Sequence, residues 1–238
     1  KHTAGQKAGH KKAGSEKAGH HKPSDPAHLA WAHKYGMDGS TMPKEPDVTS
    51  ASAQQQAAAT DLLVRTESAT AKYGDLATAR AAGYDLQASL AKAEKKKPGL
   101  ADALKKADAG MPAMDGQMKM LHVGNQANKS DGKVLDPSAP ETLMYGYEGN
   151  GHWKLMGVMY TARESYPQAP PDPGGQITRW HYHSKHDGAS LMMHIFFIPG
   201  NKLGPAYAPE LGERDPPRRS NGRLAWDAPP RAVPGCPQ

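Results

Sequence analysis

The sequence predicts an α+β fold, in which N-terminal helices pack on an antiparallel β-sheet of about five strands. Apolar side chains recur at helical spacing between residues 50 and 109, and from residue 118 they follow the pattern of strands. Turn-rich segments separate the expected strands, and adjacent strands joined by short connections pair antiparallel. Helices followed by strands are typical of this fold class, so we expect one α+β domain over residues 50–204.

Three helices are expected in the first part of this domain. Ser50 can cap the first helix, which can continue as far as Arg80 before Gly83 ends it. The Pro98-Gly99 pair then divides the following segment into two short helices. The predicted ranges are Ala51–Tyr73, Leu86–Lys96 and Leu100–Ala109.

Five strands are expected in the second part of the domain. Their flanks are rich in glycine, proline, asparagine and aspartate, which favour turns. The predicted ranges are Met118–Val123, Thr142–Tyr147, Trp153–Ala162, Ile177–His183 and Leu191–Ile198.

The two ends of the chain are expected to be disordered. Residues 1–22 repeat Lys-Ala-Gly and have too few large apolar side chains to offset the entropy of ordering. The rest of the segment up to residue 49 resembles a linker, because four prolines interrupt any periodicity. After Gly204 the chain is rich in proline and arginine, and we expect an extended tail over residues 205–238.

The net charge of +6 belongs mostly to the N-terminal tail. Residues 1–22 hold six lysines and one glutamate and contribute +5, which leaves +1 for the rest of the chain. A nearly neutral body disfavours nucleic-acid binding except through the tail. The longest aliphatic and aromatic run, Ile195–Ile198, is far too short to span a bilayer.

Cysteine usage and missing motifs exclude several classes of protein. Cys236 is the single cysteine, so zinc fingers and iron–sulfur clusters, which need several thiolates, are excluded. The sequence contains no P-loop, nucleophile elbow, Rossmann glycine pattern or H-E-x-x-H. The chain begins with Lys1, which fits removal of a signal peptide and fits a trimmed chain equally. We expect a periplasmic or secreted bacterial protein.

One predicted hairpin carries the most informative pattern in the sequence. Asp187-Gly188 lies between two apolar runs and predicts a two-residue β-hairpin turn. In that register His181 lies opposite His194, and His183 lies opposite Met192. Because side chains alternate along a strand, these four share one face. The other face is expected to join the core, since it carries Trp180, Tyr182, Met193, Ile195 and Phe197.

Three imidazoles and one thioether on this face predict a site for one transition-metal ion. Cross-strand partners lie about 5 Å apart at Cβ, which is close enough to share an ion. His186, opposite Ala189, is a weaker candidate ligand. Histidines on strands are also common as ordinary core or surface residues. A longer loop over residues 185–190 would keep the faces while changing which residues lie opposite.

A methionine-rich segment leads into the first expected strand. Met118, Met120 and His122 alternate and therefore share a face, and the spacing from Met111 and Met114 onward resembles that of exported bacterial copper-handling proteins. Thioethers are soft ligands that favour Cu(I), although a methionine stripe also packs irregular cores. If the sheet brings this histidine beside the hairpin, the combined ligands suit copper or zinc. The same face carries no carboxylate, which disfavours Mg²⁺ and Ca²⁺.

Histidines in the N-terminal tail form a second, weaker candidate. His10, His20 and His21 lie in the flexible segment, where they can collect metal ions at low affinity. Two alternatives stay open: a solvated basic tail that binds an anionic polymer, and a charge that responds to pH.

An ordered series of phrases runs through the domain: Ala71-Lys-Tyr-Gly-Asp-Leu-Ala-Thr-Ala-Arg-Ala-Ala-Gly-Tyr84, Met120-Leu-His-Val-Gly-Asn125, Leu135-Asp-Pro-Ser-Ala-Pro-Glu-Thr-Leu-Met-Tyr145, Leu155-Met-Gly-Val-Met-Tyr160, Trp180-His-Tyr-His183 and Met193-His194. In this order they resemble a family of exported bacterial proteins that has no assigned activity. The resemblance covers about residues 69–210 and implies no reaction. The chain departs from the family in its His-rich head and in a lysine-rich insertion over residues 86–110. The residues that the resemblance singles out are His122, His181, His183 and His194.

A second resemblance is to the cupins. Gly175, His181, His183 and Asp187 follow the G-x5-H-x-H-x3-E spacing of that family, with aspartate in place of glutamate. The second cupin motif, which carries a further histidine downstream, is missing.

Three hypotheses for function follow. The first is an exported transition-metal-binding protein, with copper favoured over zinc, that sequesters the ion or delivers it to a partner protein. The second is a metal-dependent oxygenase or hydrolase with a three-histidine site, which needs a base from Asp187, Glu148 or Glu164. The third is an interaction protein whose basic tail binds an anionic polymer. The sequence favours the first and thus a non-enzymatic role.

Overall fold

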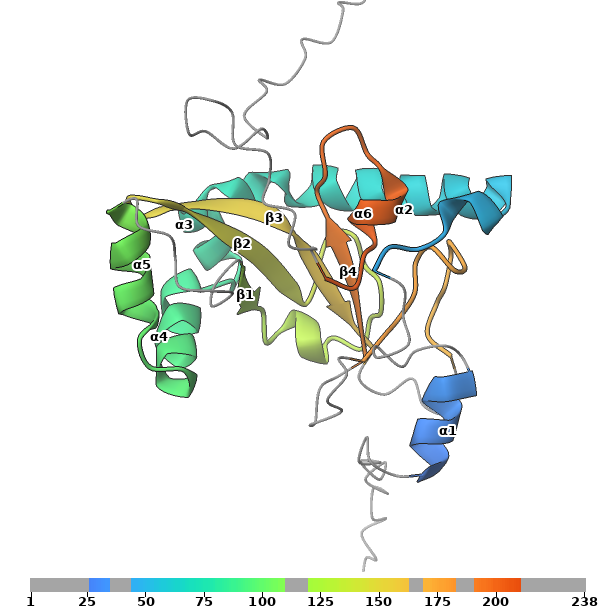
Figure 1. The fold of residues 1–238 in the computed structure, drawn as a ribbon, viewed down its shortest axis with the longest axis horizontal. Helices are drawn as coiled ribbons and strands as arrows, with labels where there is room; N and C mark the ends of the chain where they lie inside the picture. The colour runs from blue at the N-terminus through green and yellow to red at the C-terminus, as the bar shows by residue number, and fades with distance from the viewer. Residues whose placement is uncertain (1–25, 35–43, 110–119, 163–168, 183–190, 211–238) are drawn as a thin grey trace, which may run out of the picture.

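Residues 26–34, 44–109, 120–162, 169–182 and 191–210 are described by the computed structural model (Figure 1). Their architecture confirms the predicted α+β class, because helices precede and accompany a single antiparallel sheet. Figure 1 shows one long helix lying along the sheet and two shorter helices beside one of its edges.

The helices begin and end where side chains and backbone conformation allow. The longest starts with a capping box, in which Ser52 Oγ accepts from Gln55 N and the Gln55 side chain accepts from Ser52 N. The expected cap, Ser50, lies in a 3-10 turn instead, so this helix begins later than predicted. The helices are α1 (Pro26–Lys34), α2 (Ala53–Thr70), α3 (Leu76–Ala81), α4 (Leu86–Lys96), α5 (Leu100–Asp108) and α6 (Leu203–Ala206), with 3-10 turns η1 (Val48–Ser50), η2 (Ala71–Gly74) and η3 (Asn128–Ser130).

Within the described residues the sheet contains four strands, one fewer than expected, and every neighbouring pair is antiparallel. The predicted strand Ile177–His183 is reduced to an isolated bridge between His181 and Met192. The first part of this segment does not join the sheet, because its backbone N–H groups are used in turns. Ile177 N and Thr178 N donate to the glycine carbonyls three residues earlier instead of to a neighbouring strand. In spatial order the strands are β1 (Leu121–Gly124), β2 (Thr142–Gly149), β3 (His152–Thr161) and β4 (Met192–Phe196).

One face of the sheet, which we call the core face, packs against α2. Buried tyrosines tie the layers together: Tyr160 Oη and Thr66 Oγ1 are 2.9 Å apart, and Tyr207 Oη donates to Ala59 O at 2.7 Å. The side chains predicted for the core side of the hairpin do pack there. The core face is formed by Leu121, Val123, Leu143, Tyr145, Val158, Tyr160, Met193 and Ile195, joined by Trp180 and Tyr182, with Phe197 packed against it.

Two described helices reach beyond the domain boundaries expected from the sequence. Within the expected linker, α1 starts at Pro26, a favourable first helical residue, and buries Trp31 and Ala32. Beyond the expected C-terminal boundary, α6 leads into Tyr207, which is also buried. The composition of both segments predicted a linker and a tail. One buried aromatic ring in each, Trp31 and Tyr207, supplies enough apolar area to hold a short helix against the domain. No helix in the described residues is long and apolar enough to cross a membrane.

Candidate metal-binding face of the sheet

The sheet face opposite the core face carries thioethers and imidazoles in place of most aliphatic side chains. Residues paired across antiparallel strands share a face, and so do residues two apart on one strand. Phe196 and Ala208 pack among the methionines and complete a small second cluster. We call the Met–His face the set formed by three cross-strand pairs, His122 with Met144, Met159 with His194 and His181 with Met192, together with Met120.

The hairpin register differs from the two-residue turn predicted at Asp187-Gly188. His181 N donates to Met192 O at 2.8 Å and Met192 N donates to His181 O at 3.0 Å, so His181 faces Met192 and not His194. Because the shift is an even number of residues, each side chain keeps its predicted face. The predicted pairs were wrong, whereas the predicted grouping on one face holds for the three residues described.

Two imidazoles lie close enough to share an ion. The ring centroids of His181 and His194 are 5.1 Å apart, with the planes inclined by 56°. Metal–nitrogen bonds of about 2.0–2.1 Å place two imidazole centres on one tetrahedral ion roughly 5 Å apart. The distance between these two rings therefore matches the spacing of a shared metal ion.

The tautomer of His194 is set by a backbone carbonyl. His194 Nδ1 lies 2.8 Å from Pro209 O, and a carbonyl oxygen can only accept, so Nδ1 carries a hydrogen. In the neutral ring the lone pair is then on Nε2. Metal-binding histidines typically hold one ring nitrogen in this way while the other coordinates. The ring is also stacked on Phe196, with centroids 5.5 Å apart, which fixes its orientation further.

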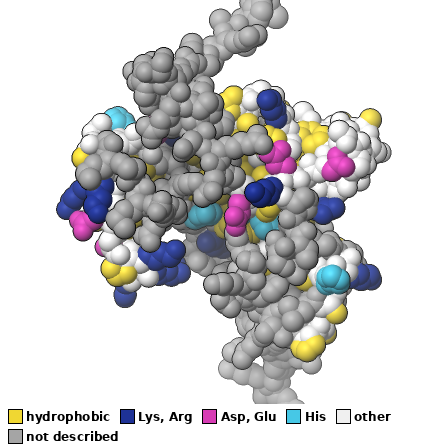
Figure 2. Space-filling model, viewed as in Figure 1, with side chains coloured by type: hydrophobic (Ala, Val, Ile, Leu, Met, Phe, Trp, Pro, Cys, Tyr) yellow, Lys and Arg dark blue, Asp and Glu magenta, His cyan; other side chains and the backbone are white. Residues whose placement is uncertain are grey.

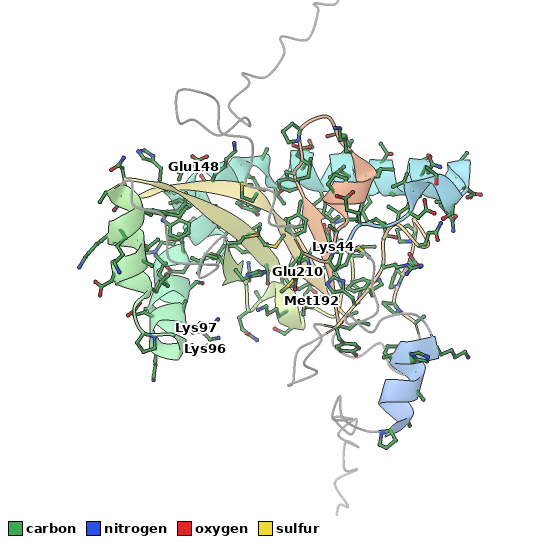
Figure 3. The ribbon with its side chains drawn as sticks, in the orientation of Figure 1. Lys44, Lys96, Lys97, Glu148, Met192 and Glu210 are labelled. Carbon is green, nitrogen blue, oxygen red and sulfur yellow. The ribbon has the colours of Figure 1, made fainter. Side chains whose placement is uncertain are left out.

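Thioethers surround this pair of histidines. Met192 lies directly opposite His181, and Met159 lies directly opposite His194. Met192 and the two imidazoles are almost completely buried, at 6%, 2% and 4% exposure. Figure 3 shows Met192 on the sheet near the centre of the molecule. The local ligand set is therefore neutral and shielded from bulk water.

The four-imidazole set expected from the sequence is not assembled by the described residues. His122 is exposed on β1, and its ring centroid lies 6.1 Å from that of His194. Within the described part of the chain, no group of three or more His, Cys, Asp or Glu side chains is placed to hold a metal ion. Two imidazoles and neighbouring thioethers are what the fold brings together.

Several candidate ligands lie outside the described residues. Among those predicted for the hairpin and its turn are His183, His186 and Asp187-Gly188. The remaining ones, in the tail and in the methionine-rich segment, are His10, His20, His21, Met111, Met114 and Met118, and Cys236 also falls outside.

A buried carboxyl group at the start of β2 was missed by the sequence analysis. Glu141 is 3% exposed, and its Oε2 accepts a hydrogen bond from Thr161 N at 3.2 Å. Thr161 pairs in turn with Met192 on the neighbouring strand, so the carboxyl lies at the end of the sheet that carries the histidines. Burial raises the pKa of Glu141 to about 7. The sequence pattern that could have indicated this buried carboxyl is a glutamate placed between a proline and an apolar strand.

Glu148, one of the three carboxylates predicted as a possible base, does not reach the Met–His face. Glu148 lies at the opposite end of β2, where it pairs with Lys154 at 4.0 Å on the surface. Asp187 and Glu164 lie outside the described residues.

Comparisons of this chain with protein-family models, curated proteins and solved structures gave no match.

Proposed function

We propose that this protein is an exported transition-metal-binding protein that sequesters the ion or delivers it to a partner, with copper as the favoured metal. The observation that carries the proposal is the placement of His181 and His194, 5.1 Å apart, beside the thioether of Met192 on one sheet face. Export is inferred from the sequence and is part of the same proposal.

The chemistry of the donors favours copper over zinc. Protein zinc sites are built from thiolates, imidazoles and carboxylates, and thioethers are not among their usual ligands. Imidazole together with thioether suits copper, and thioethers favour Cu(I) in particular. Neutral donors also avoid the large penalty of burying an unpaired charge, which matches the burial of His181, His194 and Met192.

The first test removes one imidazole. We expect His181→Ala to weaken Cu(I) affinity at least tenfold, measured by competition with bicinchoninate under anaerobic conditions, because a direct ligand is lost. His152→Ala is the matched control, since His152 is exposed at the far end of β3 and lies outside the Met–His face. Equal affinities in His181→Ala and the parent protein would end the proposal.

The second test compares neighbouring methionines on β4. Met192→Leu removes a thioether from the Met–His face, and Met193→Leu removes one from the core face. Both substitutions nearly preserve volume, so each should cost less than about 1.5 kcal/mol in stability. We expect a weaker Cu(I) complex only for Met192→Leu. The opposite ranking would show that the thioethers of this face do not bind the metal.

A metal-dependent hydrolase or oxygenase is the second candidate, and Glu141 is the observation that favours it. A buried carboxyl whose pKa is raised to about 7 has the properties of a general base at neutral pH. If the protein is a hydrolase, its zinc- or copper-loaded form should cleave p-nitrophenyl acetate, and Glu141→Gln should lower kcat without weakening metal binding. Turnover unchanged in Glu141→Gln would remove this candidate base.

A further inference from the structure

A groove lies between α4, α5 and β1, outside the pair of buried histidines. Its volume is about 530 Å³, within the range of pockets that hold small organic molecules. Apolar side chains from the two helices and the strand form part of its wall. They are Ala88, Ala93, Leu100, Ala103, Met120 and Leu121.

Four lysines contribute to the remaining wall of this groove, which is completed by Gly83, Asp85, Ser89, His122, Gly124 and Gln126. Lys92 and Lys96 contribute from α4, Lys97 from the position directly after this helix, and Lys129 from η3. Lys92 and Lys96 are four residues apart, so they lie on one face of the helix. Figure 3 labels Lys96 and Lys97 where α4 ends, and in Figure 2 lysine and arginine side chains gather over α4 and α5.

The acidic residues near the groove already have other roles. Asp85 caps α4 by accepting from Ala88 N at 3.0 Å and also pairs with Arg80 at 3.6 Å. Glu94, in the same helix, accepts from Gly99 N and Ala101 N and so holds the turn between α4 and α5. Asp85 also lines the groove, but Lys92, Lys96 and Lys97 outnumber it there, so positive charge dominates this wall.

The walls of the groove are held in place by specific contacts. Asn125 Nδ2 donates to Ala82 O at 2.8 Å, which fixes the end of β1 to the connection before α4. At Gly124 a Cβ atom would lie 2.5 Å from Lys129 Nζ, so the absence of a side chain at this position is what allows the ammonium group to lie over the strand. A site arranged before binding loses less free energy in ordering.

We propose that this groove binds a small organic anion that has an apolar body, such as an aromatic carboxylate or sulfonate. Lys92 and Lys96 would pair with the anionic group, and the alanine and leucine side chains of α4 and α5 would contact the body. Inorganic phosphate alone should bind weakly, because it cannot use the apolar wall.

The probe for the test is 1-anilinonaphthalene-8-sulfonate, whose fluorescence rises when it is bound in an apolar site. We expect the double variant Lys92→Gln/Lys96→Gln to weaken binding at least tenfold, since two charge-assisted contacts are lost. Lys95→Gln is the matched control, because Lys95 is exposed beside Lys96 but does not line the groove. We expect it to change affinity less than twofold.

A second variant keeps every lysine and reduces the space. Ala103→Leu adds volume to the wall, and we expect it to weaken the probe at least fivefold while phosphate binding stays unchanged. Neutral N-phenyl-1-naphthylamine should bind much more weakly than the sulfonate. Affinity unchanged in Lys92→Gln/Lys96→Gln, equal loss in Lys95→Gln, or full affinity in Ala103→Leu would each overturn the proposal. Far-ultraviolet circular dichroism checks that each variant is folded.

Discussion

The core face and the Met–His face are built from the same four strands, and they differ in chemistry at alternate positions. The core face presents aliphatic and aromatic side chains to α2, and its tyrosine hydroxyls reach groups on the helix layer and the turns beside it. The Met–His face presents imidazoles and thioethers, and the described residues that pack against it include Ala208 and Pro209.

The difference shows that two side chains of the same type have different surroundings when they lie on opposite faces of the sheet. Met192 and Met193 are neighbours on β4, and both are buried. Met193 packs among Val, Ile and Tyr side chains of the core, whereas Met192 lies opposite His181. A thioether among hydrocarbons fills space, and a thioether beside imidazoles can also donate electrons to a soft metal ion.

The largest expected effect concerns the core face. Leu143→Ala removes a side chain with 0% exposure and should lower the free energy of unfolding by about 3 kcal/mol, measured by urea denaturation. Under conditions where the variant is folded, its Cu(I) affinity should stay within twofold of the parent protein. A loss of stability below about 1 kcal/mol would show that this face is less tightly packed than its burial indicates.

An intermediate effect is expected at Glu141, which directly precedes β2. The pKa of Glu141 is raised to about 7 from an ordinary value of 4.5, so the folded state holds its proton more tightly than the unfolded state. The stability from this proton is fully present below pH 4.5 and is lost as pH rises through about 7.

Glu141→Gln keeps an acceptor for Thr161 N and cannot ionise. It should therefore be more stable than the parent protein by roughly 2 kcal/mol at pH 8, with little difference at pH 5. Urea denaturation at both pH values measures this. Glu148→Gln is the control with the same change of charge at an exposed position, and a similar pH dependence in that variant would contradict the assignment to Glu141.

The smallest expected effect concerns α2, which covers the core face. Ser52→Ala removes the side-chain acceptor of the capping box and should lower the free energy of unfolding by about 1 kcal/mol. Thr60→Ala, at an exposed hydroxyl within the same helix, should change it by less than about 0.5 kcal/mol. Thermal unfolding compares the two variants. Cu(I) affinity should not change in either, because α2 packs on the other side of the sheet.

Local patterns predicted the elements that depend on neighbouring residues. The range of α4, Leu86–Lys96, agrees at both ends, since Asp85 caps its start and Pro98-Gly99 follows its end. The observed limits of β1 and α2 differ by a few residues from the predicted ones. At the start of α2 the difference arises because Ser52, and not Ser50, caps the helix. The strand predicted over Ile177–His183 failed because turns used its backbone groups, and periodicity does not reveal that competition.

For the candidate site, alternation along the strands was enough to group side chains by face. It placed His181, Met192 and His194 together and separated them from Met193, because a side chain's face depends only on its position along the strand. It could not give the register of the hairpin, which depends on the length and conformation of the loop.

The sequence by itself therefore determined the fold class, the helices α2, α4 and α5, and the faces of the hairpin residues, because these follow from spacing along the chain. Tertiary structure decided which histidines approach each other, that Glu141 is buried beside Thr161, and that lysines of α4 share a groove with Lys129. Such arrangements join residues distant in sequence, and their geometry is set by how the layers pack rather than by any local pattern.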